Sequence, residues 1–208
     1  MVRDVRICFV GDSLVAGLGD RQCLGWAGRL AARAAGAGYP VTYYNLGVRR
    51  ATSTDIAERW EGECRRRLPA DIDGRVVLSF GIDDTLLDDG RTWVPTERSV
   101  ANLTAVLRGT RGLGWPTLMV APPPVNDDEH NSRIEKLDAE FAEVCGAEGV
   151  SYVRVHQPLR QSTTWMREVA SEDDYHPGTA GYEEFAALIV PPWLLWLSEP
   201  GSGLPVVR

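Results

Sequence analysis

The sequence predicts an α/β fold, a three-layer α/β/α sandwich built around a five-stranded parallel sheet. Five short apolar runs rich in β-branched and aromatic residues alternate with stretches of helical spacing, which is the pattern of a parallel sheet covered on both faces. The expected strands are Val5–Val10, Val41–Leu46, Val76–Phe80, Thr117–Ala121 and Tyr152–Val155. In such sheets functional residues gather beyond the carboxyl ends of the strands.

Three apolar stripes with a helical repeat predict the helices that cover the sheet. They comprise Ile56, Trp60, Cys64 and Leu68; Val100, Leu103 and Leu107; and Ile134, Leu137, Phe141 and Cys145. The polar segment 52–55 suits the start of the first of them. A last helix is expected from about Thr179 to Val190, because Pro191 and Pro192 lack the N–H that a continuing helix needs.

Length and composition indicate one domain over residues 1–198, followed by a loosely held tail, residues 199–208. The chain has 22 Lys and Arg against 29 Asp and Glu, a net charge of −7, which argues against nucleic acid as a partner. No apolar run approaches the length of a membrane span or of a secretory signal. The four scattered cysteines lack zinc-site spacing and favour a reducing, cytoplasmic setting.

The first strand leads into Gly11, Asp12 and Ser13, at the start of GDSLVAG. The segment lacks the lysine of a phosphate-binding loop and the third glycine of a dinucleotide fingerprint, which leaves little room for a flavodoxin-like nucleotide binder. It also departs from the G-x-S-x-G elbow, since Val15 stands where the second glycine should be. Ser13 is therefore a candidate nucleophile, with an ordinary turn as the alternative.

A serine nucleophile needs a base, and the base needs a carboxylate to orient it. Asp173 precedes His176 by three residues on one loop, so it can hold the imidazole Nδ1–H and leave Nε2 to take a proton. A plain turn before Pro177 is the alternative for this segment. Gly47, after the second strand, can present a backbone N–H to an oxyanion, or it is an ordinary turn glycine.

Together these segments resemble the SGNH, or GDSL, hydrolase superfamily, whose fold is flavodoxin-like. GDSL at residues 11–14, a glycine after strand two, G-x-D-D at residues 81–84 and D-x-x-H at residues 173–176 follow the order of the family's motifs. The resemblance implies Ser13 as nucleophile, His176 as general base and Asp173 as its orienter. It also implies an oxyanion hole made by the Ser13 and Gly47 N–H groups and by the side chain at position 83.

Position 83 departs from the family pattern, because Asp83 replaces the asparagine whose amide donates to the oxyanion. An ionised carboxylate is only an acceptor. Three explanations are open: Asp83 is protonated, Arg49 or Arg50 balances its charge, or the chain is a weak or silent binding protein that keeps the fold. Arg49 and Arg50 are otherwise surface or ion-pair residues or substrate contacts.

The resemblance further implies a serine esterase or lipase that cleaves small-molecule carboxylic esters or thioesters, with no metal or organic cofactor. Asp12 and Asp84 are expected to be structural residues beside the site. Trp26, Trp93, Trp115 and Trp165 are candidates for an acyl pocket, with core or surface positions as the alternative. Residues 193–196, Trp-Leu-Leu-Trp, are expected to pack on the body or on a second copy of the chain in a homo-oligomer.

Overall fold

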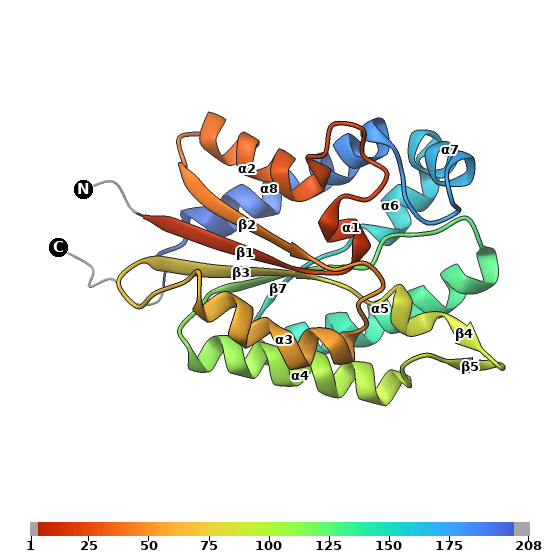
Figure 1. Ribbon diagram of the computed structural model, residues 1–208, viewed down its shortest axis with the longest axis horizontal. Helices are drawn as coiled ribbons and strands as arrows, with labels where there is room; N and C mark the ends of the chain where they lie inside the picture. The colour runs from red at the N-terminus through yellow and green to blue at the C-terminus, as the bar shows by residue number, and fades with distance from the viewer. Residues whose placement is uncertain (1–3, 202–208) are drawn as a thin grey trace.

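The five predicted strands form one parallel sheet, seen in a computed structural model that describes residues 4–201 (Figure 1). The sheet order is β2-β1-β3-β6-β7, with every pairing parallel. The strands are β1 (Val5–Gly11), β2 (Val41–Gly47), β3 (Asp73–Ser79), β6 (Thr117–Val120) and β7 (Ser151–Val153). These bounds lie within two or three residues of those expected from the sequence, and the three-layer prediction is confirmed.

Helices cover both faces of the sheet (Figure 1). One face is covered by α2 (Gly25–Gly36), α6 (His156–Gln161), α7 (Thr163–Ser171) and α8 (Thr179–Ser198). The other face is covered by α3 (Ser53–Arg65), α4 (Thr96–Gly112) and α5 (Asp128–Glu148). Most residues of the predicted stripes lie in this second core, where Ile56, Leu107 and Phe141 are fully buried. Ile134 instead packs in the core on the other face, and Val100 is half-buried.

The start of α3 shows why the sequence folds locally as expected. Thr52 is the N-cap: its hydroxyl accepts the Asp55 N–H, and the Asp55 carboxylate accepts the Thr52 N–H at 2.8 Å. This reciprocal pair satisfies backbone donors that the first turn of a helix otherwise leaves unpaired. The helix therefore begins at Ser53, directly after the β2 loop.

The last helix is longer than the sequence predicts, since α8 continues through Pro191 and Pro192 to Ser198. Each proline removes one helical hydrogen bond. The helix continues because Trp193, Trp196 and Leu197 beyond the prolines are buried against the body, whereas Leu195 is 67% exposed. The Trp193 ring centroid lies 5.6 Å from that of Phe9. Trp196 stacks on Trp193 at 5.4 Å. Trp193 and Trp196 therefore pack on the chain itself.

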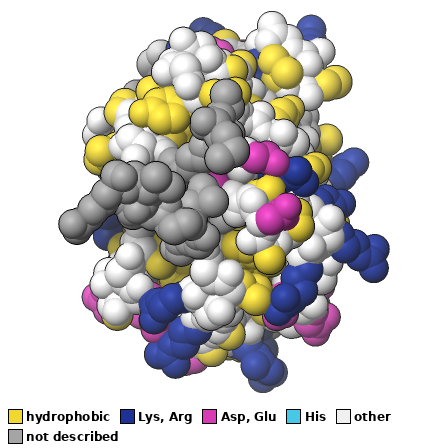
Figure 2. Space-filling model, turned by 90° about the vertical axis from the view of Figure 1, so that its left-hand side faces the viewer, with side chains coloured by type: hydrophobic (Ala, Val, Ile, Leu, Met, Phe, Trp, Pro, Cys, Tyr) yellow, Lys and Arg dark blue, Asp and Glu magenta, His cyan; other side chains and the backbone are white. Residues whose placement is uncertain are grey.

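The two ends of the described chain lie together at the amino end of the sheet. The Arg75 guanidinium there donates to the backbone oxygens of Trp196 and Glu199, each at 2.5 Å, so Glu199 is held by the body. Most of the predicted loose tail, residues 202–208, lies outside the described residues. Figure 2 shows this face, on which basic side chains gather along one side.

The carboxyl ends of three neighbouring strands are level, because Gly11 of β1 pairs with both Gly47 of β2 and Ser79 of β3. The loops that follow them, with the short helices α1 (Ser13–Ala16) and η1 (Asp83–Thr85), meet at this edge of the sheet. A small hairpin of β4 (Leu87–Asp88) and β5 (Arg91–Thr92) extends beside them (Figure 1). None of the helices described between residues 4 and 201 combines the length and hydrophobicity that a membrane span requires.

Candidate active site

Ser13 is held at the sheet edge by its two neighbours in the sequence. A Cβ on Gly11 would lie 2.0 Å from the Ser79 carbonyl oxygen, so only glycine lets β1 end this close to β3. Asp12 then caps α1, its carboxylate accepting the Leu14 N–H at 2.9 Å. Ser13 is the first residue of that helix, so its own N–H has no helical acceptor.

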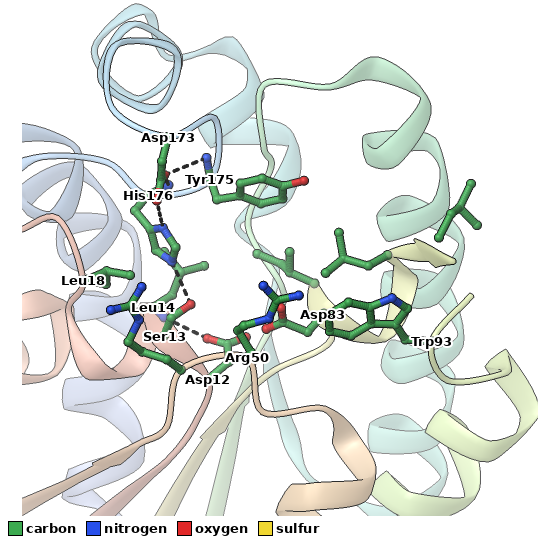
Figure 3. A pocket seen from close by; sticks show the side chains of 14 residues that line it. Asp12, Ser13, Leu14, Leu18, Arg50, Asp83, Trp93, Asp173, Tyr175 and His176 are labelled. Carbon is green, nitrogen blue, oxygen red and sulfur yellow. Dashed lines mark hydrogen bonds and ion pairs between the residues drawn. The ribbon is translucent and has the colours of Figure 1, made fainter. Parts of the chain in front are cut away.

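A hydrogen-bonded chain connects Ser13 to the loop before α8 (Figure 3). His176 Nε2 lies 2.7 Å from Ser13 Oγ, and its Nδ1 lies 2.7 Å from Asp173 Oδ2. The other Asp173 oxygen accepts the N–H groups of Tyr175 and His176. Although burial raises the pKa of Asp173, these hydrogen bonds from His176 and Tyr175 hold it below its ordinary value. A carboxylate at Nδ1 leaves Nε2 as the acceptor for the hydroxyl proton.

The loop that carries His176 is tied to the loop that follows Ser13 through the buried carboxylate of Asp20. Asp20 accepts the Gly25 N–H at 2.9 Å, the Thr179 hydroxyl at 2.9 Å and Nη1 of Arg29 at 2.5 Å. Burial opposes ionisation of Asp20, but the hydrogen bonds from Arg29 and the backbone lower its pKa. The Tyr182 hydroxyl also donates to the Leu18 carbonyl at 2.8 Å. These contacts fix the position of the loop that carries His176 relative to the segment that carries Ser13.

Gly47 is not among the residues that line the site. Its N–H donates to Asn45 Oδ1 at 3.0 Å, while the Asn45 amide donates to the Val15 carbonyl at 2.7 Å. A Cβ at Gly47 would lie 2.1 Å from the Ala16 backbone nitrogen. The glycine thus permits close packing of α1 on β2, and its predicted role as an oxyanion donor has no support from this geometry.

A cavity of about 280 Å³ opens in front of Ser13, and Arg49, Arg50 and Asp83 lie around it (Figure 3). It is lined by Asp12, Ser13, Arg49, Arg50, Asp83, Asp173 and His176, and by the apolar side chains of Leu14, Leu18, Ile82, Leu86, Leu87, Trp93 and Tyr175. Of the four tryptophans considered, only Trp93 reaches it. Trp26 and Trp165 are buried in the core, and Trp115 packs edge-on against Trp60.

Arg50 has a backbone conformation that the sequence does not reveal. Its φ of 61° lies in the left-handed region that favours glycine, and its guanidinium lies 4.7 Å from the Trp93 ring centroid. Trp93 itself follows the β4–β5 hairpin, which sequence patterning does not predict because its strands have two residues each. The sequence therefore identifies Arg50 and Trp93 as candidates one by one, but it does not predict that they lie together on one wall of the cavity.

Three carboxyl groups beside Ser13 have altered acidity. Burial raises the pKa of Asp12 to about 8, with a further contribution from Asp83. Burial also raises the pKa of Asp83 to about 6, an effect that the positive charge of Arg50 opposes. Asp84 is fully buried, its pKa is raised by burial, and it accepts the Ser53 N–H at 2.7 Å. Asp12 is therefore largely protonated at pH 7, whereas Asp83 is largely ionised.

The pKa of Asp12 predicts how stability depends on pH. A carboxyl whose folded pKa is raised binds more protons when folded than when unfolded, so the free energy of unfolding falls as pH rises from about 4 toward 8. Asp12→Asn keeps the acceptor for the Leu14 N–H and removes the ionisation. We expect the variant to be more stable than wild type at pH 8 to 9, with the difference shrinking below pH 5.

Urea titrations of both proteins between pH 5 and 9 measure this difference. The exposed residue Asp71 offers a matched control, since Asp71→Asn should leave the pH dependence of wild type unchanged. A difference between wild type and Asp12→Asn that grows as the pH falls would contradict the assigned protonation.

A metal site is not evident in the part of the chain that the structure describes: among residues 4–201 no three His, Cys, Asp or Glu side chains are grouped so as to hold an ion. The groups gathered in the cavity are instead those of a serine hydroxyl, an imidazole and several carboxyls. Such a set can activate a hydroxyl and transfer its proton without further groups.

Comparison with known proteins identifies the family of the chain. Residues 9–184 match the model of the GDSL-like lipase/acylhydrolase family. No curated protein sequence matches the chain. Many solved structures share the fold, and three of them illustrate the likeness. A lipase/acylhydrolase from Enterococcus faecalis is 24% identical over 90% of this chain and 94% of its own, with a TM-score of 0.70.

The other two structures are more distant in sequence. The esterase EstA from Pseudoalteromonas sp. is 17% identical over 93% of this chain and 99% of its own, with a TM-score of 0.73. The acetylxylan esterase Axe2 from Geobacillus stearothermophilus is 15% identical over 96% and 98%, with a TM-score of 0.71. At these identities the likeness concerns the fold, while the family match spans most of the chain. The protein belongs to the GDSL-like lipase/acylhydrolase family and is an esterase of the GDSL type.

Proposed function

We propose that the protein hydrolyses small carboxylic esters or thioesters through an acyl-enzyme formed on Ser13. The observation that carries this proposal is the chain of two 2.7 Å hydrogen bonds from Ser13 through His176 to Asp173. The comparisons are consistent with it: the three structures named above are called a lipase/acylhydrolase, an esterase and an acetylxylan esterase. Two structures of Axe2 are described as catalytic mutants, one of a serine and one of a histidine.

In the acylation step His176 Nε2 takes the Ser13 Oγ proton as the oxygen attacks the ester carbonyl carbon. Asp173 holds the imidazole by its Nδ1–H and stabilises the imidazolium. The tetrahedral intermediate collapses when His176 donates the proton to the leaving alcohol or thiol. Water then attacks the acyl-serine with His176 again as the base, which releases the acid and restores Ser13.

The oxyanion of this intermediate needs hydrogen-bond donors beside Ser13. The Ser13 N–H at the start of α1 is one. Because the Gly47 N–H is bonded to Asn45, we assign the second donor to the backbone of Arg49 or Arg50, which line the cavity. Asp83 completes the wall, and it can donate only while it is protonated.

Asp83→Asn tests the effect of the Asp83 carboxyl on the oxyanion. At pH 8 Asp83 is ionised and repels the oxyanion, whereas an asparagine amide donates to it, so we expect turnover to rise by up to about 10²-fold. The gain should shrink as the pH falls through 6, where protonation gives wild type a donor of its own. Parallel pH–rate profiles of the two proteins measure this, and a fall in turnover at every pH would show that the Asp83 carboxyl itself is needed.

The cavity volume of about 280 Å³ favours short acyl groups. A panel of p-nitrophenyl esters from acetate to dodecanoate, assayed with wild type and Ser13→Ala, tests the proposed function. We expect kcat/KM to be highest for the two- to four-carbon acyl groups, and Ser13→Ala to lose the activity. Equal rates for the two proteins would refute the acyl-enzyme.

The four cysteines are free thiols, which supports the proposal of a reducing, cytoplasmic setting.

A further inference from the structure

Two arginines line the cavity beside the reacting hydroxyl without a carboxylate at ion-pair distance among the described residues. Arg49 and Arg50 differ in this from Arg29 and Arg75, whose guanidinium groups lie 2.5 Å from Asp20 and 3.1 Å from Asp73. The chain as a whole has a net charge of −7, so these two adjacent guanidinium groups give the cavity a local positive charge that the overall composition does not. Their positive charge can therefore act on a negatively charged ligand that enters the cavity.

Arg50 is also fixed in place before any ligand binds. Its guanidinium lies over the indole of Trp93, 4.7 Å from the ring centroid, and Figure 3 shows it extending over the cavity above Asp83. Its φ of 61° lies in the left-handed region, which is unfavourable for a residue with a side chain. Residues with such backbone strain are enriched at active sites and ligand-binding sites. A stacked guanidinium also loses little side-chain freedom when it accepts a ligand.

The carboxyl groups around the cavity form no ion pair with Arg49 or Arg50 within residues 4–201, and most of them are held by other groups. Both oxygens of Asp173 are engaged by His176 and by the Tyr175 N–H. Asp12 is largely protonated at neutral pH. Asp83 is the carboxylate that acts on Arg50, and it offsets one of the two guanidinium charges. The Arg49 guanidinium has no carboxylate at ion-pair distance in the described part of the chain, and it lines the cavity together with the apolar side chains of Leu86, Leu87 and Trp93.

We propose that Arg49 and Arg50 bind a carboxylate carried by the substrate, so that the preferred substrates are small esters with one negative charge close to the scissile bond. The inference rests on the proposed function of Ser13. A guanidinium matches a carboxylate with two parallel hydrogen bonds, and it does so best in a partly apolar site such as this one. The small cavity and the ionised Asp83 favour a monoanion over a phosphate dianion.

The test compares stable alkyl esters of different charge by pH-stat at pH 7.5. Monoethyl glutarate carries the carboxylate on the acyl side and 3-acetoxypropionate on the alcohol side. Ethyl pentanoate and propyl acetate are the neutral counterparts, and acetylcholine is the cationic one. We expect kcat/KM for one of the anionic esters to exceed that of its neutral counterpart by at least about 10-fold, through a lower KM. The ester that shows the gain identifies the side on which the carboxylate lies.

Arg49→Met and Arg50→Met should each reduce this anionic-to-neutral ratio by about 10-fold, and 0.5 M NaCl should reduce it in wild type. Arg66→Met, at an exposed arginine beyond the end of α3, is the matched control and should leave the ratio unchanged. The salt dependence of wild type keeps the test valid if a variant does not fold.

Hydrolysis of neutral esters with no anionic preference, or a preference that survives both substitutions, would overturn this inference and leave the proposed function standing. Failure of wild type to exceed Ser13→Ala on every ester would instead refute the proposed function itself.

Discussion

His176→Ala is expected to lower kcat for a short-chain p-nitrophenyl ester by about 10⁶-fold, the size of the loss when the base of a serine triad is removed. The imidazole is the acceptor that touches Ser13 Oγ, at 2.7 Å. Without it the hydroxyl proton has no acceptor, and the leaving group has no donor. Asp173→Ala should cost less, about 10⁴-fold, because the imidazole can still act once it is in place.

The triad acts as a unit, so the double variant Ser13→Ala/His176→Ala should be no slower than either single variant. Ser132→Ala, at an exposed serine on α5, is the control and should retain wild-type rates. Losses for Ser13 and His176 that multiply in the double variant would contradict a shared mechanism. So would a His176→Ala protein that keeps more than a tenth of the activity.

Asp20→Ala is expected to lower the free energy of unfolding by about 3–5 kcal/mol, the cost of removing one partner of a buried ion pair. The substitution leaves the Arg29 guanidinium buried without its carboxylate, and it strands the Gly25 N–H and the Thr179 hydroxyl. Urea denaturation at pH 7 measures the change directly.

Asp71→Ala removes an exposed carboxyl and serves as the control, with an expected change within about 0.5 kcal/mol. Because Asp20 also ties the loop after Ser13 to the start of α8, Asp20→Ala should reduce kcat even at temperatures where the variant is fully folded. A destabilisation below about 1 kcal/mol would show that Arg29 finds other partners, such as the nearby Glu183.

The sequence was informative wherever a pattern is repeated along the chain. Alternating apolar runs predict the sheet, and stripes such as Ile134, Leu137 and Phe141 predict which helix faces are buried. The end of α8 is different, since the rule that proline ends a helix competes with burial of Trp193 and Trp196, and tertiary packing decides the outcome. The sequence alone offers no way to weigh these two effects.

In the site too, the sequence predicts some features, whereas others depend on the tertiary structure. Ser13 after the first strand and Asp173 and His176 on the loop before the last helix are predicted because the chemistry requires these three residue types, and the structure brings them within hydrogen-bond distance. Gly47 was a plausible donor because glycine suggests close approach, but the approach is to α1 and not to a ligand. The exposure of Arg50 to the cavity depends on one backbone angle, which no residue pattern encodes.

The central claim is that Ser13 is a nucleophile activated by His176, and covalent labelling measures it most directly. Incubation with a fluorophosphonate followed by intact-mass and peptide-mass analysis should show one adduct per chain, on the peptide that contains Ser13. The adduct should be absent in Ser13→Ala and should form far more slowly in His176→Ala. A fluorophosphonate adduct on another residue, or equally fast labelling of His176→Ala, would contradict the account.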